Sequence, residues 1–219
     1  MKYIAKVVFP AIIAGIPAGV FCQTTSTGAM PQYLYTEFKT SRVLMKAGQT
    51  QTPEMNYNIV TEKMVFVRDK KYYDLTNPEM VDTIYLQDGK FVPVGKACYE
   101  FLVKGKNDLF AEHKGDLLTA GKPVGYGGTS QVSSSNYISS VQLSGMQYNL
   151  PLPPDFLIKQ SVIYWIRTGE EMSSFINEKQ FLKLFPAESV KLKSFIKENR
   201  IRFDNPEHLV KLVKYLNSL

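Results

Sequence analysis

Hydrophobic and polar positions alternate along much of the chain between residues 33 and 167, which predicts a protein built of antiparallel β-strands. In the clearest case Tyr99, Phe101 and Val103 recur at every second position with Glu100 on the opposite side, as on a strand that buries one face. The pair Asp88-Gly89 separates two such segments and suits a tight turn. We expect strands over residues 33–38, 41–46, 57–60, 64–67, 71–75, 81–86, 91–94, 98–103, 109–114, 137–143 and 157–167.

Two of these segments carry further information. Segment 157–167 contains the run Val162-Ile163-Tyr164-Trp165-Ile166, which is typical of a central strand, and we expect Trp165 to anchor the core. Pro93 has no backbone N–H group and therefore predicts an edge or a bulge in its strand.

At Asn177 the spacing of apolar positions changes from two to about 3.6 residues, which predicts helices. Asn177 and Gln180 have the spacing of a capping box, and Asn205-Pro206 supplies a cap followed by a first-turn proline. Because helices this short are unstable alone, they must pack on one another or on the sheet. We expect three, over about residues 178–185, 190–199 and 206–216.

Together these patterns predict an α+β fold, with an antiparallel β-meander or sandwich-like body followed by a small bundle of three short C-terminal helices. We divide the chain into a leader at 1–22, a β-rich domain at 23–176 and a helical region at 177–219 packed on the sheet. We expect the last two parts to bury one joint interior.

The segment 119–136 interrupts the alternation because it is rich in glycine, serine and threonine. It cannot bury a core, and we expect a mobile loop that is a candidate contact surface. A phosphate-binding function is disfavoured, because no Gly-Lys-Ser/Thr sequence closes the segment.

The first 22 residues have the pattern of an export signal peptide, with two lysines before an apolar stretch at 7–21. At about 15 residues this stretch is shorter than the roughly 20 needed to span a bilayer. We expect cleavage between Cys22 and Gln23, with a cut after Ala29 as an alternative. A second alternative, an acylated Cys22, is disfavoured by the large Phe21 that precedes it.

The positive charge is concentrated at the C-terminal end. Of the formal net charge of +6, residues 178–219 contribute +4, from nine basic and five acidic residues, while 23–177 contain 15 of each sign. A basic face attracts anionic lipid or envelope polymers, although interspersed glutamates are also typical of a solvated helix surface. We expect no nucleic acid partner. The candidate anion-binding residues are Lys183, Lys191, Lys193, Lys197, Arg200, Lys211 and Lys214.

The sequence predicts no metal site and no cofactor. His113 and His208 are the two histidines of the chain, and neither has an acidic residue and a second histidine at a metal-binding spacing. Cys98 lies in an apolar run and is expected to be a buried thiol without nucleophilic function.

One catalytic combination stays open, because catalytic triads assemble in space and not in sequence. It joins His113 to Asp108 or Asp116 and to one of the serines at 133–135. Nothing in the chain has the pattern of a nucleophile elbow.

Several blocks of sequence form a moderately specific pattern of strands and terminal helices. They are YNIVTEKMVF at 57–66, NPEMVDTIYLQDGKFVPVG at 77–95, CYEFLVKGK at 98–106, FPAESVKLKSFIKENRIRF at 185–203 and NPEHLVKLVKYLNSL at 205–219. Together they resemble a widespread group of exported Bacteroidetes proteins that have no assigned function. The resemblance covers most of the chain after the leader. It implies a secreted or periplasmic β-rich body with a helical tail, and it implies no active-site residues.

We therefore expect an exported periplasmic or cell-envelope protein that acts as a non-enzymatic interaction or structural component, with another envelope protein as its partner. Exposed strand edges, the segment 119–136 and the basic helices are the expected contact surfaces. One alternative is a small periplasmic hydrolase. The other is a binder of anionic envelope polymer or lipid through the basic C-terminal helices.

Overall fold

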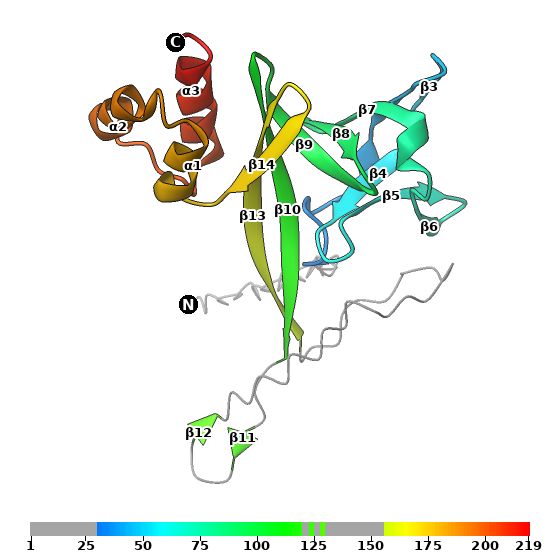
Figure 1. The fold of residues 1–219 in the computed structure, drawn as a ribbon. Coiled ribbons are helices and arrows are strands. Elements are labelled where there is room, and N and C mark those ends of the chain that lie inside the picture. The colour runs from blue at the N-terminus through cyan, green and yellow to red at the C-terminus, as the bar shows by residue number, and fades with distance from the viewer. Residues whose placement is uncertain (1–29, 120–122, 125–127, 130–155) are drawn as a thin grey trace, which may run out of the picture.

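The computed structural model describes residues 30–119, 123–124, 128–129 and 156–219. Antiparallel sheets are followed by three C-terminal helices (Figure 1), which confirms the predicted α+β class. The leader at 1–22 and the strand expected at 137–143 lie outside the described residues.

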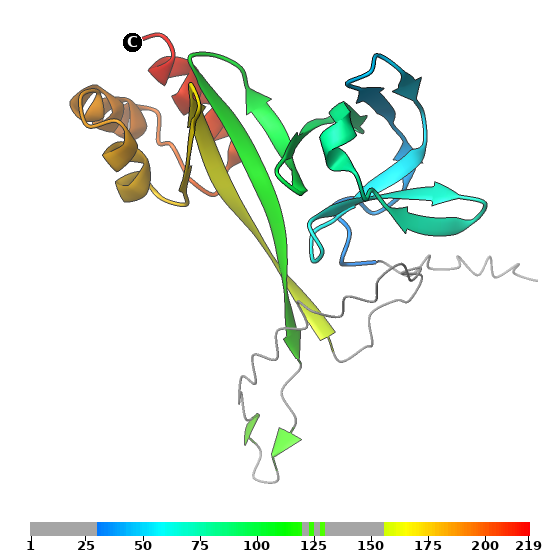
Figure 2. The ribbon, with the colours of Figure 1, turned by 45° about the vertical axis from the view of Figure 1, so that its right-hand side comes forward.

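The larger sheet has eight strands in the order β14-β13-β10-β9-β8-β7-β2-β3. The two longest, β10 and β13, pair over their whole lengths and extend beyond the other strands (Figures 1 and 2). The strands of this sheet are β2 (Arg42–Met45), β3 (Thr50–Gln51), β7 (Val81–Leu86), β8 (Gly89–Val94), β9 (Ala97–Val103), β10 (Asn107–Thr119), β13 (Phe156–Thr168) and β14 (Glu171–Phe175).

A second sheet has four strands in the order β1-β4-β5-β6. Its strands β4 and β5 form the expected hairpin, with Met55 opposite Phe66, and a short 3-10 helix, η1 (Pro78–Met80), leads from β6 into β7. The strands are β1 (Lys39–Thr40), β4 (Glu54–Asn58), β5 (Lys63–Arg68) and β6 (Lys71–Asp74).

The segment 119–136 is described at Thr119 and in two short strands, β11 (Pro123–Val124) and β12 (Gly128–Thr129), which pair with each other. Its other residues, on which the expected mobile loop depends, lie outside the described residues.

The helices begin at the caps that the sequence predicts. The Asn177 side chain accepts a hydrogen bond of 3.0 Å from the backbone N–H of Gln180, whose own side chain accepts one of 2.8 Å from Ile176 N–H. The Asn205 side chain accepts a hydrogen bond from His208 N–H. These bonds satisfy N–H groups that a helix start leaves free. The helices are α1 (Glu178–Leu184), α2 (Ser189–Glu198) and α3 (Pro206–Leu216).

The apolar residues form two clusters and not the single interior that we expected. Both clusters lie on the same face of the eight-stranded sheet. One row of directly opposed residues runs across seven strands, and its two ends belong to the two different clusters. At one end of the row the helices cover the sheet, and at the other end the four-stranded sheet covers it. The row consists of Val43, Ile84, Phe91, Glu100, Ala111, Tyr164 and Phe175.

The side chains of β9 do not all lie as the alternation predicts. The register between β9 and β10 shifts between Leu109 and Phe110, and such a bulge changes the face on which a side chain lies. Val103 therefore joins the helical cluster, whereas Tyr99 and Phe101 lie on the other face of the sheet, away from both clusters.

Trp165 also lies on that other face, which corrects its expected place in the core. The side chain is half-buried and belongs to neither cluster. Its ring stacks on Tyr99, with 5.9 Å between centroids, and its Nε1–H donates a 2.8 Å hydrogen bond to Glu112. The apolar residues of this run in β13 thus lie on both faces of the sheet.

Two further differences concern short segments. Residues 33–38 form no strand but only an isolated bridge between Tyr33 and Asn58. In contrast, Glu171–Phe175 forms the strand β14, which the sequence analysis does not predict. In the first segment the backbone groups of Tyr35 and Glu37 hydrogen-bond to the Asn56 side chain instead of to a neighbouring strand. The second segment pairs with β13 over five residues.

Candidate functional site

Glu100 and His113 form a polar junction between the two hydrophobic clusters. The Glu100 Oε2 and His113 Nε2 atoms are 2.7 Å apart, and the side chains are 22% and 16% exposed. Both residues lie on the covered face of the sheet, since His113 follows the row residue Ala111 by two positions on β10. The rings of Tyr57 and Phe91 lie beside the imidazole, each with its centroid 6.3 Å away. The pair therefore lies on the eight-stranded sheet between the part that the four-stranded sheet covers and the part that the helices cover.

Within the described residues, neither aspartate of the catalytic set that the sequence leaves open hydrogen-bonds to His113. The carboxylate beside His113 is Glu100 and neither Asp108 nor Asp116. Asp108 instead accepts hydrogen bonds from Arg167 and from a turn backbone N–H, and Asp116 is exposed. The serines at 133–135 lie outside the described residues, and no described serine hydrogen-bonds to His113. What the structure shows here is a histidine–carboxylate pair in a structural position.

A second ionic group lies on the opposite face of β10. The Lys114 Nζ atom is 3.1 Å from both Glu62 and Glu112 carboxylates, and Glu112 also accepts the Trp165 hydrogen bond. Burial raises the pKa of Glu62 against the influence of the lysine. Partial burial lowers the pKa of Lys114, but its hydrogen bonds to Glu112 and Glu62 raise it overall. These groups satisfy one another and hold the β4–β5 turn on β10.

Cys98 is buried in the cluster under the four-stranded sheet. Burial raises the pKa of its thiol to about 12, so the group is protonated at neutral pH. Because the thiolate is the reactive form, Cys98 is an apolar core residue and not a nucleophile.

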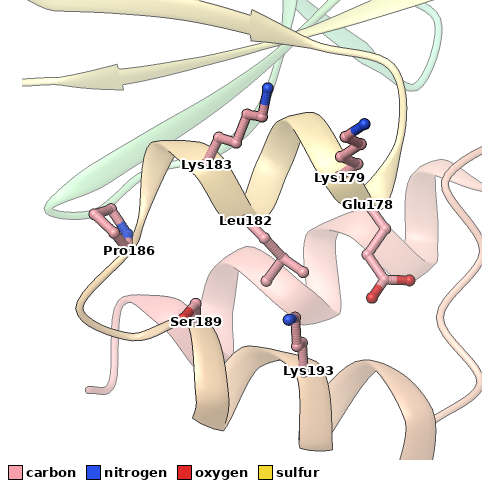
Figure 3. Close-up of a pocket in the computed structure, with 7 residues that line it drawn as sticks. All are labelled: Glu178, Lys179, Leu182, Lys183, Pro186, Ser189 and Lys193. Carbon is pink, nitrogen blue, oxygen red and sulfur yellow. The ribbon is translucent and has the colours of Figure 1, made fainter.

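A surface hollow of about 660 Å³ lies between α1 and α2. Figure 3 shows Leu182 and Glu178 pointing from α1 toward α2, and Lys193 pointing from α2 toward α1. Lys179 and Lys183 rise from α1 on the side away from α2. Pro186 and Ser189 complete the lining. We call this hollow the α1–α2 groove.

The predicted basic residues are all exposed, but they do not gather on one face. Lys183 and Lys193 line the α1–α2 groove. Lys197 shares a flank of α2 with Lys193, four residues away, whereas Lys191 lies about 200° around the helix from Lys193. Lys211 lies between α2 and α3, where its Nζ donates a 2.7 Å hydrogen bond to the Asn199 side chain.

Arg200 and Lys214, the other two predicted residues, do not line the groove. Arg200 lies in the turn after α2 with a positive φ of 50°, and Lys214 is on the exposed side of α3. The groove contains one lysine that the sequence analysis did not single out, Lys179. The signal for it is its spacing of four residues from Lys183, which places both on one side of a helix.

The described part of the chain contains no group of three or more histidine, cysteine, aspartate or glutamate side chains placed to hold a metal ion. Among its helices, none has the length and apolar character needed to cross a membrane. No protein-family model, curated protein or solved structure matched this chain when it was compared with them.

Proposed function

We propose that this chain is an exported periplasmic or cell-envelope protein that binds another envelope protein and does no chemistry on it. Contact is made through the α1–α2 groove, and the bound segment of the partner is acidic with interspersed apolar residues. The observation that carries the proposal is that three lysines line the groove together with apolar residues and form no salt bridge among the described residues.

The lysines of the groove have no structural use in the described residues. Lys179, Lys183 and Lys193 form none of the salt bridges found there. Three lysines and Glu178 give the lining a formal charge of +2. A surface with net positive charge attracts an acidic ligand. Leu182 and Pro186 contribute apolar side chains to the lining.

A fluorescent peptide of alternating glutamate and leucine residues tests the groove directly. We expect the purified chain to raise the anisotropy of this peptide, and the triple substitution Lys179→Gln, Lys183→Gln and Lys193→Gln to weaken binding about tenfold. The matched control replaces three exposed lysines of the β-rich part, Lys39, Lys46 and Lys96, by glutamine. Equal losses in the two triple variants contradict the proposal, because they reduce it to an effect of net charge.

A second candidate, binding of anionic lipid, has one specific observation in its favour. Val190 is 76% exposed and lies on the same flank of α2 as Lys193 and Lys197, so that flank combines an apolar side chain with two cations. Flotation with vesicles of phosphatidylglycerol tests it. This candidate predicts that Val190→Ser reduces flotation, whereas a protein-binding groove predicts no flotation at all.

Export is the second part of the proposal, and its support is the pattern of the leader. Production of the full chain in a bacterium with an outer membrane, followed by mass spectrometry of the purified protein, tests it. We expect a first residue of Gln23. A mass that includes the leader contradicts export by cleavage, and a lipid adduct on Cys22 identifies the lipoprotein alternative.

A further inference from the structure

Strand β13 has an open backbone edge below the end of β14. On one side, β10 pairs with the whole of β13, but on the other side β14 pairs only with the stretch from Tyr164 to Thr168. No described residue donates or accepts a backbone hydrogen bond at the outer side of 157–163. Figure 1 shows this lower half of β13 continuing past β14. Within the part of the chain that the structure describes, seven residues of this long strand therefore have an unpaired edge.

The direction of the free backbone groups on β13 follows from one hydrogen bond of its partner strand β10. This bond lies on the edge of β10 that faces away from β13. Gly115 N–H donates to Ile59 C=O at 2.8 Å, and so points away from β13. In an antiparallel pair, both residues opposite each other point their backbone groups either inward or outward. Gln160, opposite Gly115, therefore points outward, as do Ile158 and Val162 two positions away. These three residues present three N–H donors and three C=O acceptors along the edge.

A surface hollow of about 350 Å³ lies beside the same edge. Gln160 and Val162 line it from β13, together with Tyr164. Ile176, which follows the end of β14 and is 56% exposed, and Phe203, from the loop before α3, add apolar lining, and Ser161 and Asp204 add polar lining. Backbone groups and a hollow that is partly apolar thus lie side by side, as at surfaces that accept an added strand.

We propose that the edge of β13 at 157–163 binds an extended segment of a partner polypeptide as an added β-strand. The outward groups at Ile158, Gln160 and Val162 hydrogen-bond to its backbone, and one of its apolar side chains enters the hollow beside Val162. This surface is separate from the α1–α2 groove, so it goes beyond the function proposed above and does not depend on it.

The occupant is fixed by the geometry of the edge. A regular row of donors and acceptors is satisfied by extended backbone and not by a helix, a lipid or a polysaccharide. Because β14 already occupies the position beside Tyr164, the added strand pairs with at most seven residues. A second copy of the chain is the alternative extended occupant, and hydrogen exchange measured at several protein concentrations distinguishes it from a partner segment.

The first test compares Gln160→Pro with Gln160→Ala. Both variants lack the glutamine side chain, but only proline removes the outward N–H, and proline is tolerated at a free edge. The probe is a heptapeptide of alternating valine and threonine with a lysine at each end. We expect the alanine variant to bind it like the original chain and the proline variant to bind it about tenfold more weakly. Equal binding by the two variants overturns the proposal.

The second test does not depend on the folding of the proline variant. Saturation with the heptapeptide should slow amide hydrogen exchange, measured by NMR, at Ile158, Gln160 and Val162, whose N–H groups point outward. A heptapeptide N-methylated at alternate residues, so that its edge donors are lost, should give no such protection. Protection by the methylated peptide overturns strand addition. Protection without any peptide, growing with protein concentration, overturns the partner segment in favour of a second copy.

Discussion

Asn217 at the end of α3 and Asn107 at the start of β10 are joined by three hydrogen bonds across 110 residues of sequence. The Asn217 Oδ1 atom accepts from the backbone N–H of Asn107 at 2.8 Å and from its side chain at 3.0 Å, and the Asn217 amide donates back to the Asn107 carbonyl at 3.0 Å. Asn107 also accepts from Thr168. The C-terminal helix α3 is thus attached to the hairpin of β9 and β10.

Replacing Asn217 by alanine should therefore destabilise the protein although the residue is only half-buried. The substitution leaves Asn107 groups without partners, and we expect a loss of about 1–3 kcal/mol in the free energy of unfolding, measured by urea denaturation. Ser218→Ala, at the exposed neighbouring position, serves as the control and should change the value by about 0.5 kcal/mol or less. Similar values for the two variants contradict the attachment.

Gly115 is required where the β4–β5 turn meets β10. A Cβ atom built there would lie 2.8 Å from Ile59 Cγ1 and 2.9 Å from Ile158 Cγ2. Since both neighbours are packed in the cluster under the four-stranded sheet, we expect Gly115→Ala to cost about 1–3 kcal/mol of unfolding free energy. Ile158→Ala added to Gly115→Ala should cost less than the sum of the two single effects, because it makes room for the new methyl group. Additive effects in thermal unfolding contradict the contact.

Replacing Lys114 should lower the free energy of unfolding more than replacing Lys63, although the ion pair of Lys63 is shorter. Replacing Lys114 by methionine leaves Glu112, which is 4% exposed, without its cation, and we expect a loss of about 2 kcal/mol or more. Lys63→Met breaks an exposed 2.8 Å pair with Asp74 and should cost less than about 1 kcal/mol. Chemical denaturation of both variants measures the difference, and the reverse order refutes it.

Four tyrosines should make the fold sensitive to alkaline pH. Burial is the main cause that raises the pKa of each to about 12. Unfolded chains lose these protons near pH 10, so between about pH 10 and 12 the folded state holds more protons and its stability falls as pH rises. Absorbance at 295 nm should show late ionisation that coincides with loss of the circular dichroism signal. A titration in which all tyrosines ionise near pH 10 while the circular dichroism signal stays unchanged contradicts this. The residues are Tyr33, Tyr35, Tyr99 and Tyr164.

The helices could be predicted from local sequence because their signals are local. The Asn177 and Asn205 caps act over three residues, and the change in apolar spacing needs no knowledge of the rest of the fold. The strand β7, Val81–Leu86, was likewise predicted with its correct bounds, since a turn follows it directly. Pro93 also fits its expectation, because it pairs with Cys98 on one side and lies beyond the last pairing with β7 on the other.

The faces of the strands could not be predicted in the same way. Alternation assigns Glu100 to the solvent side of β9, but the structure places it in the covered row between Phe91 and Ala111. The bulge at Leu109 and Phe110 transfers Val103 to the helical cluster, and a one-residue shift in pairing is invisible in a single sequence. Trp165 was misplaced for a related reason, since both faces of β13 carry large apolar residues.

The candidate sites needed the same long-range information. Glu100 and His113 meet because β9 and β10 pair, and the open edge of β13 depends on where β14 ends. The basic residues could be found from composition, but their separation among the groove, the flanks of α2 and the contact with α3 depends on how the helices pack. Charge counts indicate how much positive charge a region carries and not where it gathers.

Salt dependence of binding tests the central claim of an acidic partner segment in the α1–α2 groove most directly. The dissociation constant of the glutamate–leucine peptide should rise steeply with sodium chloride for the original chain, because screening weakens attraction between exposed charges. The triple variant at Lys179, Lys183 and Lys193 should lose most of that dependence, while the control variant at Lys39, Lys46 and Lys96 keeps it. A dissociation constant that does not change with salt, or that depends on salt equally in all three proteins, contradicts the account.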